Sequence, residues 1–153
     1  MTHLIGLISD THGLLRPEAI RALTGSEAII HAGDIGSPSI LSALQSIAPV
    51  TAVRGNVDRD PWAQNLPKTA VLLMARASIL VVHDIGELDL VPEAAGFTAV
   101  VFGHSHRPSL ERRSGVTFVN PGSAGPARFN LPVSLARMPV HDGAIEVEFV
   151  TLK

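Results

Sequence analysis

The chain of 153 residues contains no cysteine. This excludes disulfide bonds, thiolate metal ligands and cysteine nucleophiles, so a metal site would have to use His, Asp, Asn and water. Tyrosine is also absent, and there are only one tryptophan and five phenylalanines. Aromatic side chains on which single-stranded nucleic acid could stack are therefore scarce.

Charge is sparse and nearly balanced, with 12 Lys and Arg against 14 Asp and Glu and a formal net charge of −2. No basic stripe favours nucleic acid or an anionic membrane as a partner. The first apolar run, 3–9, follows no basic segment and is broken by Asp10. We therefore expect neither a signal peptide nor a membrane span, and a cytoplasmic location.

Hydrophobic residues make up 46% of the chain, enough to fill the core of one compact domain over residues 1–153. No internal repeat, low-complexity tract or linker interrupts it.

The first half alternates apolar strands with helices. The strands are predicted over 3–9, 27–33 and 50–55, and the helices over 16–24 and 37–48, the second opened by Ser37 and Pro38. This order implies right-handed crossovers and a parallel sheet. The motifs SDTHG, AGDIG and RGNVD would then lie at the carboxyl ends of neighbouring strands.

The second half is richer in hairpin signals. Apolar strands are predicted over 69–75, 78–84 and 99–104, with a short helix over 89–96. Antiparallel strands are predicted over 109–113, 116–120, 133–140 and 144–152. We expect these late strands to extend the sheets.

Polar side chains gather at the predicted strand ends, where open α/β sheets bind ligands. They are Asp10, His12, Asp34, Asn56, His83, His104 and His106. Carboxylate oxygens and imidazoles are ligands for Mn²⁺, Fe or Zn²⁺. This set exceeds one tetrahedral shell and suits two ions that share a carboxylate.

Two of these histidines stand only two residues apart, in the segment VFGHSHRPSL over 101–110. If that segment is extended, alternation aims His104 and His106 at the same side of the chain. Each motif alone has an ordinary explanation as a turn or a cap, and His83 alone as a buried histidine. The ordered combination favours a metal site, with His31 predicted to be a buried histidine near it.

The motifs SDTHG, GDIG, GNVD, GHSH and NPGS follow one another as in calcineurin-like metallophosphoesterases. The chain resembles in particular the small YfcE-like phosphodiesterase branch, which also ends its motifs in NPGSAGPAR. The resemblance implies an α/β fold, a four-layer α/β/β/α sandwich with a dinuclear metal site at the carboxyl ends of the strands.

The resemblance also implies roles for individual residues. Ligands of the first metal would be Asp10, His12 and His106. Ligands of the second would be Asn56, His83 and His104, with Asp34 as the bridging carboxylate. The residues implied to be catalytic are Asp34, Asn56 and His104. Candidates for orienting ligands or contacting substrate are Ser9, Arg54, Asp58 and Asn120.

The activity implied is hydrolysis of small phosphodiesters by a hydroxide that bridges two divalent ions. Mn²⁺ is the expected metal, with Fe, Zn²⁺ or Ni²⁺ as alternatives. Two positions depart from the family pattern. Val57 stands where many members have the histidine thought to protonate the leaving group, and Asp84 follows His83 where glycine is common.

Two other functions remain open at this stage. The small subunit of retromer has this fold and works as an interaction scaffold, but a scaffold has no need of a complete ligand set. A nuclease is disfavoured by the absence of a basic stripe and of stacking aromatics. The apolar late hairpins also leave self-association into a homo-oligomer open.

Overall fold

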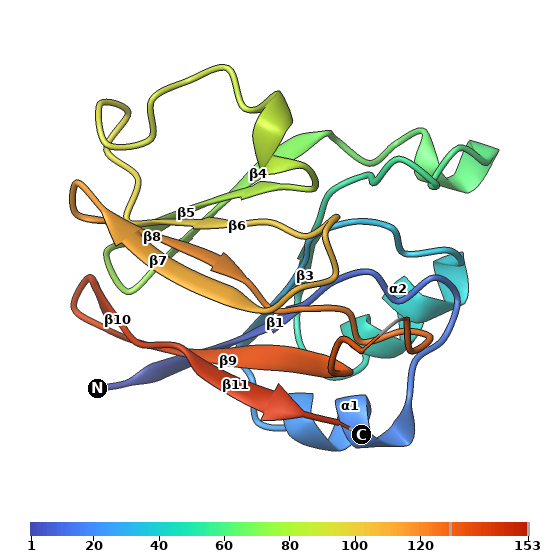
Figure 1. Ribbon diagram of the computed structural model, residues 1–153. Coiled ribbons are helices and arrows are strands. Elements are labelled where there is room, and N and C mark those ends of the chain that lie inside the picture. The colour runs from blue at the N-terminus through green and yellow to red at the C-terminus, as the bar shows by residue number, and fades with distance from the viewer. Residues whose placement is uncertain (129, 153) are drawn as a thin grey trace.

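The computed structural model describes residues 1–128 and 130–152, and within them the strands form two sheets packed face to face (Figure 1). The first sheet has the strand order β10-β9-β1-β2-β3, with β11 also paired to β9. Its strands are β1 (His3–Ile8), β2 (Ala28–His31), β3 (Val50–Ala52), β9 (Ser134–His141), β10 (Ala144–Ile145) and β11 (Glu148–Thr151).

The parallel half of this sheet follows the prediction. Strands β1, β2 and β3 pair in parallel and are connected by α1 (Pro17–Leu23) and α2 (Pro38–Gln45). Both helices begin with a proline, and the Ser37 hydroxyl caps α2 by accepting the Ser39 N–H at 3.2 Å. No helix in the described part of the chain is long and apolar enough to cross a membrane.

The second sheet has the strand order β4-β5-β6-β8-β7. Its strands are β4 (Thr69–Met74), β5 (Ala77–Val82), β6 (Ala99–Val101), β7 (Ser109–Arg113) and β8 (Val116–Asn120). The predicted hairpin between β7 and β8 is present, and Ser114 and Gly115 turn it with positive φ angles of 52° and 79°. Two short 3₁₀ helices complete the fold, η1 (Pro61–Ala63) and η2 (Ile85–Glu87).

Three apolar clusters define the layers. Ile5, Val101 and Met138 belong to the cluster between the two sheets. A second cluster packs α1 and α2 against the first sheet, and a third packs the loop around η2 on the outer face of the second. Figure 1 shows α1 below the lower sheet and this loop above the upper one. The predicted α/β sandwich is confirmed, with a thin fourth layer of 3₁₀ helix and loop.

The prediction of a helix over 89–96 is wrong. The segment holds turns only, with a single i to i+4 bond from the Ala95 N–H to the Val91 carbonyl at 3.1 Å. Pro92 restricts Val91 to extended geometry, so too few residues remain before Gly96 to build a helix.

The strand predicted over 144–152 is divided into β10 and β11. Both pair with β9 in one continuous register, and the Glu146 N–H still donates to the Pro139 carbonyl at 3.0 Å. Pro139 has no N–H to return the second bond of that pair, which interrupts the ladder there.

Candidate metal centre

The loops after the parallel strands are fastened to one another by backbone hydrogen bonds. The Asp10 N–H donates to the Gly33 carbonyl and the His12 N–H to the Asp34 carbonyl, each at 3.0 Å. The loop after β1 therefore runs beside the loop after β2. This brings the side chains of Asp10, His12 and Asp34 to one edge of the sandwich.

Most of the candidate ligands have left-handed backbone geometry, which is strained for residues other than glycine. Positive φ angles occur at Asp10 (55°), His12 (47°), Asp34 (56°), His104 (74°) and His106 (63°). The other non-glycine residues with positive φ in the described ranges are Ala75, Arg76, Ser114 and Asp142, which turn hairpins. Strain held outside hairpin turns in this way is typical of a functional site.

The segment with the paired histidines is not extended, so strand alternation does not set the directions of the two rings. Strand β6 ends at Val101, and the Ser105 N–H folds back onto the Gly103 carbonyl at 2.9 Å. With both histidines left-handed, His106 is buried while His104 is exposed. Both rings nevertheless reach the site, His104 beside Asn56 and His106 beside Asp10.

One group of potential ligands consists of Asp10, His12 and His106. The Nε2 atoms of the two histidines are 3.4 Å apart. The His106 Nε2 lies 3.4 Å from Asp10 Oδ1, and the His12 Nε2 lies 3.9 Å from the same oxygen. These residues are the ones that the sequence assigns to the first metal.

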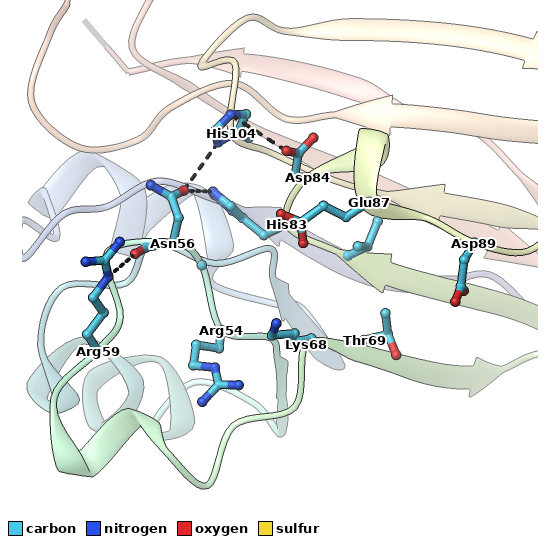
Figure 2. Close-up of a pocket in the computed structure, with 12 residues that line it drawn as sticks. Arg54, Asn56, Arg59, Lys68, Thr69, His83, Asp84, Glu87, Asp89 and His104 are labelled. Atoms are coloured by element: carbon cyan, nitrogen blue, oxygen red, sulfur yellow. Dashed lines mark hydrogen bonds and ion pairs between the residues drawn. The ribbon is translucent and has the colours of Figure 1, made fainter.

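A second group surrounds His83, whose Nε2 lies 3.3 Å from Asp34 Oδ2 and 3.0 Å from Asn56 Oδ1. The same Asn56 oxygen is 3.3 Å from the His104 Nδ1, and Figure 2 shows Asn56 facing both rings. Asp34 also reaches the first group, because its Oδ2 is 3.7 Å from the His12 Nε2. The structure therefore brings all the predicted ligands together, with Asp34 between the two groups.

The residues present fit a divalent cation. Asp10 Oδ1 is buried and accepts no hydrogen bond within the described residues. Three imidazole Nε2 atoms surround it, those of His106, His12 and His83, the last at 4.0 Å. A buried carboxylate oxygen without a donor is costly unless a cation is bound. Imidazole and carboxylate donors suit Mn²⁺, Fe or Zn²⁺.

Known proteins resemble this chain in sequence and in fold. The model of the calcineurin-like phosphoesterase superfamily domain matches residues 4–143. The chain belongs to the calcineurin-like phosphoesterase superfamily. It is 33% identical over 141 residues to a probable metallophosphoesterase of Methanothermobacter thermautotrophicus, covering 84% of this chain and 81% of that protein.

Solved structures show the same fold. YfcE, a phosphoesterase from E. coli, aligns with a TM-score of 0.68 at 21% identity, covering 100% of this chain and 98% of YfcE. Vps29 from Chaetomium thermophilum aligns with a TM-score of 0.79 at 23% identity, covering 97% of each chain. The predicted calcineurin-like superfamily is confirmed by the family model, and these two structures confirm its fold.

In this calcineurin-like phosphoesterase, three of the predicted supporting residues hold the ligand loops in place. The Ser9 hydroxyl donates to Asp10 Oδ2 at 2.7 Å. Asp58 is buried and accepts the backbone N–H groups of Ile35, Gly36 and Gly55, which binds the loops after β2 and β3 together. Asn120 donates to the Gly103 carbonyl at 3.0 Å and to Ser105 Oγ at 3.1 Å. The fourth candidate, Arg54, lines a cavity beside the site.

The charges of the site residues depend on one another. Burial disfavours the charged forms of Asp34 and His83, but their direct hydrogen bond and attraction outweigh it. The pKa of Asp34 is therefore lowered and the pKa of His83 raised. Burial lowers the pKa of His12, against the attraction of Asp34 and Asp10. A cation bound at the second group would displace a proton from His83.

His31 is fully buried below the site, as predicted, and its bonds fix its tautomer. Its Nδ1 accepts the Gly33 N–H at 3.1 Å, so its Nε2–H donates to Thr11 Oγ1 at 3.0 Å, and that hydroxyl donates to the Ile35 carbonyl at 2.8 Å. Burial lowers the pKa of His31 to about 4, although neighbouring carboxylates oppose the shift. It is a neutral structural histidine at neutral pH.

This low pKa predicts a loss of stability in weak acid. Between about pH 6.5 and pH 4 the unfolded chain protonates His31 and the folded chain does not, so stability falls as the pH falls. In chelator-treated protein, the free energy of unfolding should drop between pH 7 and pH 5 by about 2 kcal/mol more in the wild type than in His31→Gln. Urea titrations at both pH values measure this difference.

The exposed His141 supplies the control for this experiment. His141→Gln should follow the wild-type pH dependence, because its ring is not buried among the ligand loops. Equal pH dependence in the wild type and His31→Gln would contradict the assignment of His31 as a buried neutral group.

Several charged residues near the site were not predicted from the sequence. Arg59, Lys68, Glu87 and Asp89 line the same cavity as Arg54, together with Asp84. Arg59 and Glu87 stand close in sequence to Asn56 and His83, which was the available signal, but Lys68 does not. The glycine usual after the His83 ligand is not needed here, because Asp84 has an ordinary φ of −112° and caps η2 by accepting the Gly86 N–H at 2.9 Å.

Proposed function

We propose that the chain is a metal-dependent phosphodiesterase that hydrolyses small phosphodiesters with two divalent ions, Mn²⁺ being the expected metal and Fe, Zn²⁺ or Ni²⁺ the alternatives. The observation that carries the proposal is the convergence of the predicted ligands around Asp10 and Asp34. Membership of a phosphoesterase family supports the hydrolase class.

The chain offers two adjacent sets of ligands. Asp10, His12 and His106 would hold one ion. Asn56, His83 and His104 would hold the other, and Asp34 faces both. When bound, two such ions activate water as a nucleophile and neutralise charge on the phosphoryl oxygens.

The chain's own bonds prepare these ligands. The His83 Nδ1–H donates to the Ala32 carbonyl at 2.7 Å, which directs Nε2 toward Asp34 and Asn56. The Val57 N–H donates to Asp34 Oδ1 at 3.0 Å and leaves Oδ2 facing the imidazoles. Gly55 permits close packing on Asp34, because a Cβ at this position would overlap the backbone and Oδ1 of Asp34. The ligand geometry therefore does not depend on the ion alone.

A diester is favoured by the space around the second ligand group. Asn56, His83 and His104 line one end of an open cavity, so a phosphate at the site has room for an ester substituent beside it. We further propose that the enzyme is cytoplasmic and has no specificity for nucleic acid or membranes. Sedimentation of the purified protein would show whether it forms a homo-oligomer.

The test combines metal analysis with a substrate panel. Protein purified without chelator and saturated with Mn²⁺ should hold two ions per chain and hydrolyse bis(4-nitrophenyl) phosphate faster than 4-nitrophenyl phosphate. Removal of the metal should reduce the rate at least about 100-fold. Asp10→Asn should fail to recover activity on metal addition, and Glu18→Gln, at a partly exposed position on α1, should behave as the wild type. A faster monoester reaction would overturn the diesterase proposal.

The second candidate function is a non-catalytic interaction scaffold. The fold shared with Vps29 favours it. Its expected result is a purified protein that hydrolyses neither diesters nor monoesters with any metal of the panel, even when metal is bound.

A further inference from the structure

A cavity of about 470 Å³ opens beside the second ligand group, with Asn56, His83 and His104 at one end (Figure 2). This volume lies in the range of small-molecule sites. Because these three residues belong to the candidate metal centre, a phosphate held there would direct one of its substituents into the cavity.

One side of the cavity is basic. Arg54, Arg59 and Lys68 come from the chain between β3 and β4. Arg54 Nη1 donates to Gln64 Oε1 at 3.3 Å, and Gln64 Nε2 donates to the Arg59 carbonyl at 3.0 Å. Arg59 Nε donates to the Asn56 carbonyl at 3.0 Å. Within the described residues, no carboxylate forms an ion pair with any of these three cations.

The facing side is acidic and is built from the segment after β5. Asp84, Glu87 and Asp89 line it, and in the described part of the chain none pairs with a lysine or arginine. Figure 2 shows Arg59, Arg54 and Lys68 along the lower side, and the three carboxylates above and to the right. Opposite charges that face one cavity without pairing leave it electrically polarised.

We propose that the substrate is a small phosphodiester whose one arm carries a second anionic group, phosphate or carboxylate, bound by Arg54, Arg59 and Lys68. This inference rests on the proposed function, because it takes the scissile phosphate to lie at the metal centre. The ions there neutralise that phosphate, so the cations of the cavity are available for another anion. Guanidinium and ammonium groups bind both phosphate and carboxylate.

The acidic side limits the length of this substrate. A polyanion continuing through the cavity would approach Asp84, Glu87 and Asp89, and like charges in a partly enclosed site repel. A single second anion held on the basic side avoids them. The cavity therefore selects a doubly anionic small molecule against a nucleic acid strand.

The experiment uses three diesters that share a 4-nitrophenyl leaving group and differ in the other arm, which is 2-methoxyethyl, 2-carboxyethyl or 2-(phosphonooxy)ethyl. With Mn²⁺-saturated protein, kcat/KM for each diester with an anionic arm should exceed that for the diester with the neutral arm at least tenfold. The difference should come from a lower KM. Comparison of kcat/KM for the phosphate and carboxylate diesters shows which of the two anions the cavity prefers. Lys68→Gln should bring the ratio of anionic to neutral substrates close to one, and Lys68→Arg should retain it.

The exposed Arg21 on α1 provides a control of equal charge change, and Arg21→Gln should keep the wild-type ratio. A ratio near one in the wild type, with clear hydrolysis of the neutral diester, overturns this inference and leaves the proposed function intact. Unequal anionic arms identify the preferred anion and support the inference.

A binding measurement covers the case in which no diester is hydrolysed, which would count against the proposed function. Calorimetric titration compares ethylene glycol bisphosphate with 2-hydroxyethyl phosphate. The bisphosphate should bind at least tenfold more tightly to the wild type, and this advantage should disappear in Lys68→Gln. Equal affinity of the two ligands for the wild type overturns the inference independently of turnover.

Discussion

Asp34→Asn protein will bind fewer than two divalent ions per chain and hydrolyse diesters about 10³-fold more slowly than the wild type, equivalent to about 4 kcal/mol of lost transition-state stabilisation. The reason is the position of the carboxylate between the two ligand groups. Its Oδ2 lies 3.3 Å from the His83 Nε2 and 3.7 Å from the His12 Nε2. A neutral amide at this position removes one of the two carboxylate charges that face both groups, the other being that of Asp10.

Asparagine is the sharper substitution because of the backbone. Asp34 has a positive φ of 56°, which asparagine tolerates better than alanine does. A loss of metal in Asp34→Asn therefore reports on the carboxylate rather than on a refolded loop. Metal content by mass spectrometry and circular dichroism of the same sample separate the two causes.

Asp142→Asn, in the turn between β9 and β10, is the matched control and should keep wild-type metal content and rate. Two ions per chain in folded Asp34→Asn, or a single ion in Mn²⁺-saturated wild type, would show that Asp34 does not join a metal pair.

The convergence of the ligands could be predicted from the sequence because parallel strands end at a shared edge. Asp10, Asp34 and Asn56 each follow a strand of the β1, β2 and β3 sheet, and the hydrophobic runs that define those strands are unambiguous. The prediction that failed concerned one short segment. The helix over 89–96 depended on composition, and one proline, Pro92, decided against it.

The different contacts of His104 and His106 could not be predicted in the same way. It depends on left-handed backbone at both residues and on Asn120, which holds the intervening loop from the end of β8. These are contacts between segments distant in sequence. The polarised cavity could not be predicted for the same reason. Arg59 and Glu87 line one cavity only because two separate loops fold toward it.

Val57 should make hydrolysis depend steeply on the leaving group. Breaking the phosphorus–oxygen bond leaves negative charge on the departing oxygen, and a positioned general acid contributes about 10²–10⁴-fold by protonating it. Val57 follows the predicted ligand Asn56 and is 47% exposed, and its side chain has no proton to give. Aryl diesters with acidic phenols should react readily, and alkyl diesters should be slower by a comparable factor.

The nearby carboxyl of Asp58 does not replace the missing acid. It is buried and its two oxygens accept backbone N–H groups from Ile35, Gly36 and Gly55. These contacts use both of its oxygens, and the residue is only 2% exposed, so it is not available to donate a proton to a departing oxygen. The structure therefore strengthens the expectation drawn from Val57.

Rates for substituted aryl and alkyl diesters, measured in the wild type, Val57→His and Val57→Gln, test this reading. Val57→His should raise the rates of alkyl diesters far more than those of nitrophenyl diesters, which reduces the dependence on leaving-group pKa. Val57→Gln, polar but unable to transfer a proton, should keep the steep wild-type dependence and thereby separates acid catalysis from added polarity. A flat wild-type series with chemistry rate-limiting would mean that another group, such as His104 at the cavity end, already supplies the proton.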